Sequence, residues 1–543
     1  MKMKIFWACE EITCTNYSDS HIMFCNKRIK NVCGRFARIG LMSKTQKIFI
    51  GDDMRKVIEN QLKIGQTDIP QIQIDLLCRD EIPQLLLGLQ HIYSHRPNRD
   101  KVFKILKKIT PKDVAADKGR PGMDLWKILV LGTLRLNCNW DYDKVHNIAN
   151  EHKTVREFLG HSIFEFDQKY GLQTIKDNVS LLTPELLDEI NKVVINVGHD
   201  VVRKKDEELV LKGRCDSFVL ETDVHYPTDI NLLLDAIRKT LFLIGDLCGD
   251  LGITEWRQYR HIFKKIKKQF NLVRKLNRSS SKNSEKKAKR EQLIKDAHRA
   301  YVDLVEAYVR RAEVSIAILN EMGIDAVTRI ILIESYIAHA KRQIDQIRRR
   351  VIDDETIAHC EKVFSIFEEH TEWISKGKAG VPQELGLGVC VLEDQYGFIL
   401  HHHVMEKQKD VEIAVMMVAE AKRKFAALSC CSFDKGFYSQ KNRKELQGLL
   451  DDVVLPKKGK LSAAEKRIEF SGEFIEARHK HAAVESAINA LENHGMDRCL
   501  DFGLKGFKRY VALAVLARNI QILGAKLRQR SLARQRRLDR LAA

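Results

Sequence analysis

The sequence lacks the features that identify several large classes of protein. Its thirteen cysteines are odd in number and scattered without a C-x-x-C pair, so we expect neither a disulfide framework nor a conventional zinc site. The longest uninterrupted apolar runs, such as 330–333 and 511–517, are far shorter than the ~18–20 residues of a membrane-spanning helix. Phe6-Trp7-Ala8 is too short for the core of a signal peptide. These absences favour a soluble protein in a reducing, cytoplasmic compartment.

Positive charge, in contrast, is abundant. The 543 residues include 92 Lys and Arg against 73 Asp and Glu, which gives a net charge of +19. A surplus of this size suits a polyanionic partner, and nucleic acid is favoured over a membrane surface because no segment qualifies for the bilayer. A chain of this length is expected to form about two to four domains.

Three acids lie on or beside one predicted strand. Residues 214–229 read R-C-D-S-F-V-L-E-T-D-V-H-Y-P-T-D, with the β-branched and aromatic content of a buried strand and a stop at Pro227. The acids are Asp216, Glu221 and Asp223, and a buried carboxylate is costly unless it is paired, hydrogen-bonded or bound to a metal. For any single acid, an exposed edge strand is the simpler interpretation, and the pattern does not separate Asp216 from Asp223.

A hairpin and a second acidic strand end are predicted further along the chain. Residues 388–392 and 398–404 alternate as strands around a polar turn. His401 to His403 point alternately to opposite faces, so we interpret them as strand residues rather than metal ligands. A helix through 411–425, begun by Asp410 as its cap, leads to an apolar strand that ends at Asp434. An acid at that position is where open α/β sheets place ligands.

A late helix carries the third candidate acid. In residues 478–495, Val484, Ile488 and Leu491 form a packing stripe at i, i+4 and i+7, and the helix ends at a glycine. Arg478, His481, Glu485 and Glu492 share a neighbouring face, which places acids among basic groups.

The order of these elements predicts the fold. A strand, a hairpin, a helix, a strand and further helices form the β-β-β-α-β arrangement of an α/β RNase H-like core with a mixed sheet, interrupted by a long helical insertion. Its acids are expected to meet at one edge of the sheet. Three carboxylates there can hold two divalent ions roughly 3.5–4 Å apart, a clamp for phosphoryl displacement. Oxygen ligands favour Mg²⁺, and Mn²⁺ is able to substitute.

Three blocks together resemble a known family. D-S-F-V-L-E-T-D-V-H-Y-P-T-D from residue 216, D-K-G-F-Y-S from 434 and R-H-K-H-A-A-V-E-S-A-I-N from 478 are similar to the DDE transposases of bacterial insertion sequences, and most of all to the ISNCY type. The resemblance runs over about residues 119–525. It implies a catalytic and metal-binding triad of Asp216, Asp434 and Glu485, and it favours Asp216 over Asp223.

The resemblance also implies partners and a reaction. Water cuts the DNA at the end of the element, and the released 3′-OH then attacks a target phosphodiester. The expected partners are double-stranded DNA, as terminal inverted repeats and as target, and a second copy of the chain on paired ends, without a membrane, in the bacterial cytoplasm at the nucleoid. The residues expected to contact DNA are Arg120, Lys457, Lys458, Lys460, Arg478 and Lys480.

The expected organisation follows from these assignments. The chain divides into an irregular extension upstream of a later start at Met42 (1–41), an all-helical amino-terminal DNA-binding region (42–205), the first part of the core (206–237), a basic helical insertion (238–385), the rest of the core (386–525) and a basic tail (526–543).

One departure from the family pattern keeps alternatives open. Many relatives carry a basic residue two turns after the catalytic glutamate, where this chain has Glu492. Arg478, Lys480 or Lys457 would then grip the phosphate, or the third acid would be Glu492 or Glu476. A catalytically inactive DNA-binding relative and an RNase H-like nuclease that does not transpose are the two alternative functions.

Overall fold

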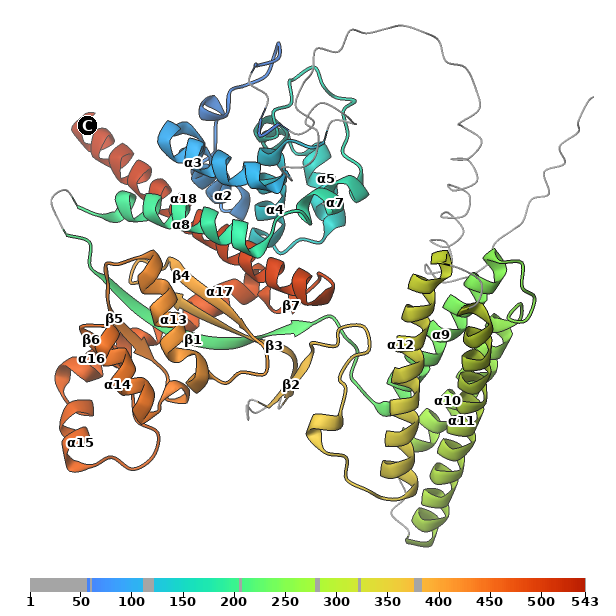
Figure 1. Ribbon diagram of the computed structural model, residues 1–543. Coiled ribbons are helices and arrows are strands. Elements are labelled where there is room, and N and C mark those ends of the chain that lie inside the picture. The colour runs from blue at the N-terminus through green and yellow to red at the C-terminus, as the bar shows by residue number, and fades with distance from the viewer. Residues whose placement is uncertain are drawn as a thin grey trace, which may run out of the picture. The chain divides into compact units, whose positions relative to one another are not determined.

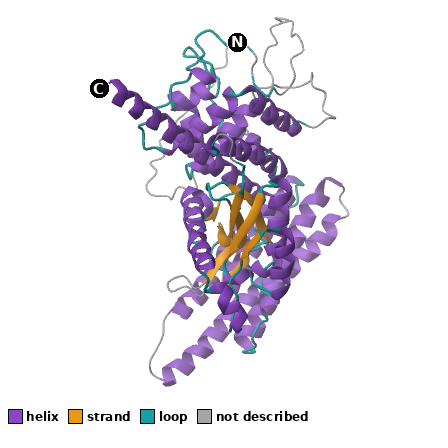
Figure 2. Cartoon of the chain, turned by 90° about the vertical axis from the view of Figure 1, so that its left-hand side faces the viewer, coloured by secondary structure: helices purple, strands orange, loops and turns teal. Residues whose placement is uncertain are grey.

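The computed structural model describes residues 56–58, 61–110, 122–204, 208–278, 284–320, 324–375 and 383–542. All of these residues belong to one compact unit. The predicted extension 1–41 and Arg120 lie outside the described ranges. The protein is mostly helical, with one mixed sheet (Figure 2).

Helices form the amino-terminal part of the described chain. Thr183 caps the last of them, because its hydroxyl accepts from the amide of Leu186 at 3.3 Å. These helices share one apolar core with the sheet and with the helix that ends the chain. The helices are α2 (Glu81–Ser94), α3 (Arg96–Leu106), α4 (Leu125–Asn137), α5 (Tyr142–Glu151), α6 (Lys153–Phe158), α7 (Leu172–Val179) and α8 (Pro184–Val202).

The sheet follows these helices. Its strands are β1 (Leu211–Thr222), β2 (Glu372–Ser375), β3 (Gln383–Glu393), β4 (Ile399–Met405), β5 (Leu428–Phe433), β6 (Asp452–Val454) and β7 (Arg498–Cys499). The order is β2-β3-β1-β5-β6, with β4 paired to β3 and β7 paired to β1. β3 is antiparallel to β1 and β4, while β5 is parallel to β1 and β6. The predicted hairpin, the mixed sheet and the acidic strand are confirmed.

Helices cover both faces of the sheet (Figure 1). On one face α13 and α14 contact each other, as expected when two successive parallel connections cross the sheet with the same hand. On the other face lie α17 and α18. The helices of this part are α13 (Asp410–Lys424), α14 (Gln440–Leu449), α15 (Ala463–Glu469), α16 (Gly472–His481), α17 (Ala483–Leu491) and α18 (Gly503–Ala542).

Four long helices lie between β1 and β2 in the sequence and have an apolar core of their own. Thr228 caps the first, since its hydroxyl accepts from the amide of Asn231 at 3.3 Å. A π-helical turn, Arg348–Ile352, follows the last. The helices are α9 (Asp229–Asp250), α10 (Tyr259–Arg278), α11 (Ser284–Leu319) and α12 (Ile324–Ile347).

One long helix, α18, ends the described chain. The expected basic tail 526–543 is, as far as residue 542, part of this helix. By length and composition α18 is apolar enough to cross a membrane, although 72% of the qualifying window is buried inside the protein.

Candidate active site

The register of two neighbouring strands places two of the predicted acids side by side. β1 and β5 run parallel, and Cys215 pairs with Phe433 at the end of β5. Both residues are buried, and a slip by one residue would turn them out of the core. Asp216 and Asp434 follow them directly in the chain, so the two carboxylates lie next to each other at one edge of the sheet.

Glu485 approaches the same edge from α17. Val484, Ile488 and Leu491 are buried and anchor this helix, while Glu485 in its first turn is exposed. The pKa of Asp216 is raised to about 6, first by burial and then by the charges of three nearby acids, while the hydrogen bond from the amide of Ser217 lowers it; the acids are Asp434, Asp410 and Glu485. The structure therefore brings the three predicted acids into one electrostatic neighbourhood.

Asp410 is a fourth acid that the sequence did not indicate as part of the site. It is the first residue of α13, and the cap position belongs to Lys409, so the expected capping role is wrong. Its Oδ1 accepts from the hydroxyl of Ser217 at 2.6 Å. A β-carbon on Gly436 would lie 3.1 Å from its Oδ2, which brings Asp410 close to the turn after Asp434. An aspartate at a helix start is an ordinary pattern, so no sequence signal distinguished it.

The four acids carry negative charge without a basic partner. Among the described residues, no Lys or Arg forms an ion pair with Asp216, Asp410, Asp434 or Glu485. The amide of Ser217 donates to Oδ1 of Asp216 at 2.8 Å. In the described part of the chain, no three His, Cys, Asp or Glu side chains are grouped closely enough to hold a metal ion. The oxygen donors thus suit a hard cation, but they are not drawn together around a closed cage.

The other acids considered from the sequence are paired. Glu221 and Asp223 lie 3.6 and 3.7 Å from the guanidinium of Arg498. Asp229 lies 2.8 Å from Arg350. This contrast separates Asp216 from Asp223, which the strand pattern alone could not do.

The predicted late helix is broken beside the site. α16 ends at His481 and α17 begins at Ala483, so His481 and Glu485 are not successive turns of one helix as expected. The Nδ1 of His481 lies 3.0 Å from the hydroxyl of Ser432 on β5. Burial lowers the pKa of His481, and Arg214 lowers it further against the opposing charges of Asp434 and Glu485. The ring is therefore neutral at pH 7.

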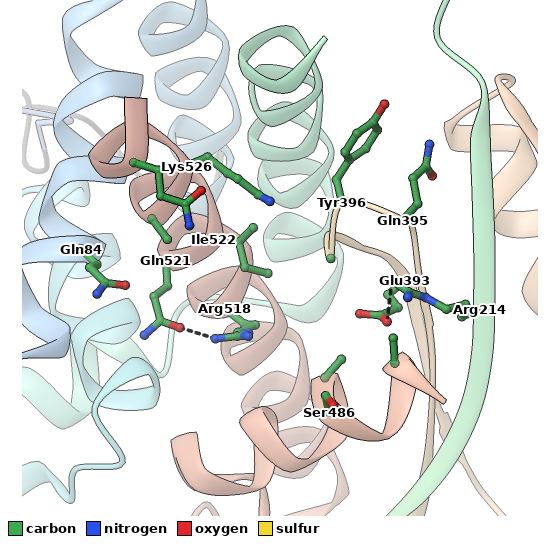
Figure 3. Close-up of a pocket in the computed structure, with 15 residues that line it drawn as sticks. Gln84, Arg214, Glu393, Gln395, Tyr396, Ser486, Arg518, Gln521, Ile522 and Lys526 are labelled. Atoms are coloured by element: carbon green, nitrogen blue, oxygen red, sulfur yellow. Dashed lines mark hydrogen bonds and ion pairs between the residues drawn. The ribbon is translucent and has the colours of Figure 1, made fainter. Parts of the chain in front are cut away.

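A pocket of about 420 Å³ lies beside the first turns of α17, which begins at this break (Figure 3). It is lined by Arg214 of β1, Glu393 of β3, residues of α17 and residues of α18. Arg214 lies 3.0 Å from Glu393 and donates to the carbonyl of Lys480 at 3.4 Å. Burial raises the pKa of Glu393 to about 7. Arg214 thereby ties the end of α16 to the strand that carries Asp216, which supports the position of the helix break.

The residues expected to contact DNA fall into two groups. Lys457 donates to both carboxylate oxygens of Glu465 at 2.9 and 2.8 Å, and Lys480 lies 2.6 Å from Glu476. The others are exposed and have no carboxylate partner in the described ranges, namely Lys458, Lys460 and Arg478. Only the second group is free to meet a phosphate without first giving up an ion pair.

The histidine run is confirmed as part of a strand. His401, His402 and His403 lie on β4, paired with β3. Burial lowers the pKa of His402 to about 4, and His403 lies 2.7 Å from Gln408. Glu492 begins a π-helical turn, Glu492–Met496, after α17.

Comparison with protein-family models, with curated proteins and with solved structures gave no match for this chain.

Proposed function

We propose that the chain is a DDE-type transposase that cuts DNA at the ends of an insertion sequence and joins the cut ends to target DNA. One observation carries the proposal. Asp216 and Asp434 lie side by side on neighbouring parallel strands, without a basic partner in the described structure, and Glu485 adds its charge from a later helix. In a chain with a net charge of +19, unpaired acids at one sheet edge favour a cation-dependent site.

The sheet supports an RNase H-like core. In such a core, three antiparallel strands are followed by two strands parallel to the first. Here β1, β3 and β4 are successive antiparallel neighbours, and β5 and β6 continue parallel on the other side of β1. The insertion of α9 to α12 after the first strand leaves this order intact.

The donor set fits divalent ions by its chemistry. Asp216, Asp434 and Glu485 would hold two Mg²⁺ ions, which would polarise the phosphodiester and acidify the attacking water. Asp410 and the amide of Ser217 orient the site, because Ser217 bonds to both Asp410 and Asp216. Ionised Asp216 is costly in its buried position, and a bound cation would remove that cost.

The proposed reaction is two phosphoryl transfers. In the first, the oxygen of water bonds to phosphorus and the P–O3′ bond breaks, which leaves a 3′-OH on the element and a 5′-phosphate on the flanking DNA. In the second, that 3′-OH bonds to a target phosphorus and displaces the target's own 3′-OH. Neither step needs a covalent bond to the protein, and two copies of the chain would act on paired ends.

The test is cleavage of the element's own end DNA with Mg²⁺, comparing the parent with Asp216→Asn, Asp434→Asn and Glu485→Gln. We expect each variant to bind the DNA and to lose cleavage by about 10²- to 10⁴-fold, the range for an essential catalytic group. Asp223→Asn is the matched control, since Asp223 directly follows the strand that carries Asp216 and lies beside Arg498. Activity in Glu485→Gln would move the third acid to Glu492 or Glu476.

A DNA-binding relative without catalysis is the second candidate. It is favoured by the absence, in the described ranges, of three acids close enough to hold a metal. An inert parent that still binds end DNA would support this candidate, and cleavage without joining would indicate a nuclease.

A further inference from the structure

One helix of the insertion presents a basic face without a single acid. The sequence of α10, Y-R-H-I-F-K-K-I-K-K-Q-F-N-L-V-R-K-L-N-R, contains eight Lys or Arg and no Asp or Glu. Its buried residues, Ile262, Ile266, Phe270 and Val273, follow one side of the helix. All eight Lys and Arg are exposed, and six of them are called here the α10 stripe: Lys264, Lys267, Lys268, Arg274, Lys275 and Arg278.

The stripe has no counter-charge within the described protein. None of its six side chains forms an ion pair with a carboxylate of the described residues. Many other cations of the bundle are paired. Arg310 lies 2.6 Å from Glu306, Arg299 lies 2.9 Å from Asp296, and Lys341 pairs with Glu313. Carboxylates of the bundle therefore compensate many of the cations on α11 and α12, whereas α10 itself carries no acid.

An arrangement of this kind suits a linear polyanion. The stripe extends about 21 Å along the helix axis at ~1.5 Å per residue, and duplex DNA carries one phosphate per ~1.7 Å of its own axis. Aromatic rings that stack well on unpaired bases are scarce on this face: no Tyr, Phe or Trp of α10 is exposed. Contacts from lysine and arginine to phosphates position a protein on DNA and carry no sequence information directly.

We propose that the α10 stripe binds the phosphate backbone of duplex DNA without reading its sequence. The choice of DNA as the polyanion rests on the proposed function. In that setting the stripe is a DNA contact separate from the acidic edge. The stripe holds the DNA during cleavage and joining, whatever the DNA sequence.

The test is the salt dependence of DNA binding by the full chain. The variant Lys264→Gln, Lys267→Gln, Lys268→Gln, Lys275→Gln removes four charges from the stripe. The slope of log K against log[salt] is about −0.9 per phosphate contact, so we expect it to become shallower by about 3.6 units. Between 50 and 200 mM salt the parent should lose about 100-fold more affinity than this variant.

A second variant provides the matched control. The variant Lys287→Gln, Arg299→Gln, Arg310→Gln, Lys341→Gln also removes four positive charges, but from exposed residues that are paired within the bundle. Its slope should stay close to that of the parent, and far-ultraviolet circular dichroism establishes that both variants fold. Equal slopes for the two variants would overturn the proposal.

Two further arms identify the ligand and separate this proposal from the proposed function. Tighter binding to a duplex RNA of equal length, or to vesicles of anionic lipid, would overturn the assignment to DNA. If the stripe variant has a shallower slope but the parent does not cleave end DNA, the proposal for the stripe holds and the transposase proposal fails. If the parent cleaves end DNA but the slope of the stripe variant equals that of the parent, the transposase proposal holds and the proposal for the stripe fails.

Discussion

Charged side chains cluster in two places in the molecule, and the pKa of a carboxyl group is shifted in opposite directions at the two. In the helical bundle, Arg348 contacts Glu306 at 3.0 Å, and its hydrogen bonds lower the pKa of Glu306 to about 2. At the sheet edge, burial and then the charges of Asp434, Asp410 and Glu485 raise the pKa of Asp216 to about 6. The first carboxylate is stabilised in its ionised form by its surroundings, and the second is destabilised.

The difference lies in how the surroundings treat a carboxylate. Paired charges, such as those around Arg348, stabilise each other within the protein. An unpaired carboxylate in a buried position is costly, and strongly shifted pKa values of this kind gather at functional sites. The α10 stripe is the positive counterpart of the acidic edge.

The largest effect among these predictions is expected at the acid that the structure adds to the site. Asp410→Asn keeps the shape of the side chain and removes its charge beside Ser217. Because groups that orient metal ligands typically contribute 10- to 100-fold, we expect Mg²⁺-dependent cleavage to fall by about that factor. The measurement is kcat and KM on end DNA, with Asp223→Asn as control. Equal loss in both variants would remove Asp410 from the site.

The next effect is a gain in stability at the cost of activity. Asp216 has a folded pKa of about 6 against an ordinary value of 3.8, so its burial as a carboxylate destabilises the fold fully above pH 6. Without divalent ions, Asp216→Asn should raise the free energy of unfolding by about 1–3 kcal/mol at pH 7.5. The gain should shrink as the pH falls from 6 towards 4. Chemical denaturation at both ends of this range measures it, and a loss of stability at pH 7.5 contradicts the account.

The paired region should show the opposite sign. Glu306 has a lowered pKa because of Arg348, so its contribution to stability is present above pH 4.5 and is lost as the pH falls towards 2. Because the pair lies largely in solvent, Glu306→Gln should destabilise the protein by only about 0.5–1 kcal/mol at pH 7. Urea titrations with and without 1 M salt, which screens the pair, check this. A Glu306→Gln variant that is more stable than the parent would contradict the contrast between the paired and the unpaired acids.

The smallest effect concerns the predicted DNA contacts. Lys458→Gln, Lys460→Gln should flatten the slope of log K against log[salt] for end DNA by about 1.8 units. Lys457→Gln, Lys480→Gln removes cations that already have carboxylate partners, so its slope should change less. Binding titrations at several salt concentrations distinguish the two. A larger change in the second variant would show that ion pairs within the chain do not protect a lysine from phosphate.

Much of the fold followed from local patterns. The hairpin and the strand that ends at Asp434 have the period and turn chemistry of their elements, so their positions were predicted within a few residues. Tertiary features had no such signal. The break at Ala482 depends on contacts with Arg214 and Ser432, which lie on distant strands.

The candidate site divides in the same way. Asp216, Asp434 and Glu485 were identified because each stands in a block that resembles a family, and strand register then placed the first two together. Asp410 was missed because its role depends on a hydrogen bond to Ser217 across the sheet edge. The unpaired state of the α10 stripe was also invisible in the sequence, since acids elsewhere in the bundle could have neutralised it.

Strand joining tests the central claim most directly, namely that the unpaired acids at the sheet edge form a cation-dependent site for phosphoryl transfer. The substrate is end DNA already cut to a free 3′-OH, mixed with plasmid target and Mg²⁺. The account predicts covalent joining by the parent and none by Asp434→Asn at equal DNA binding. Binding of the cut end by the parent without any joined product, in Mg²⁺ or in Mn²⁺, would contradict it.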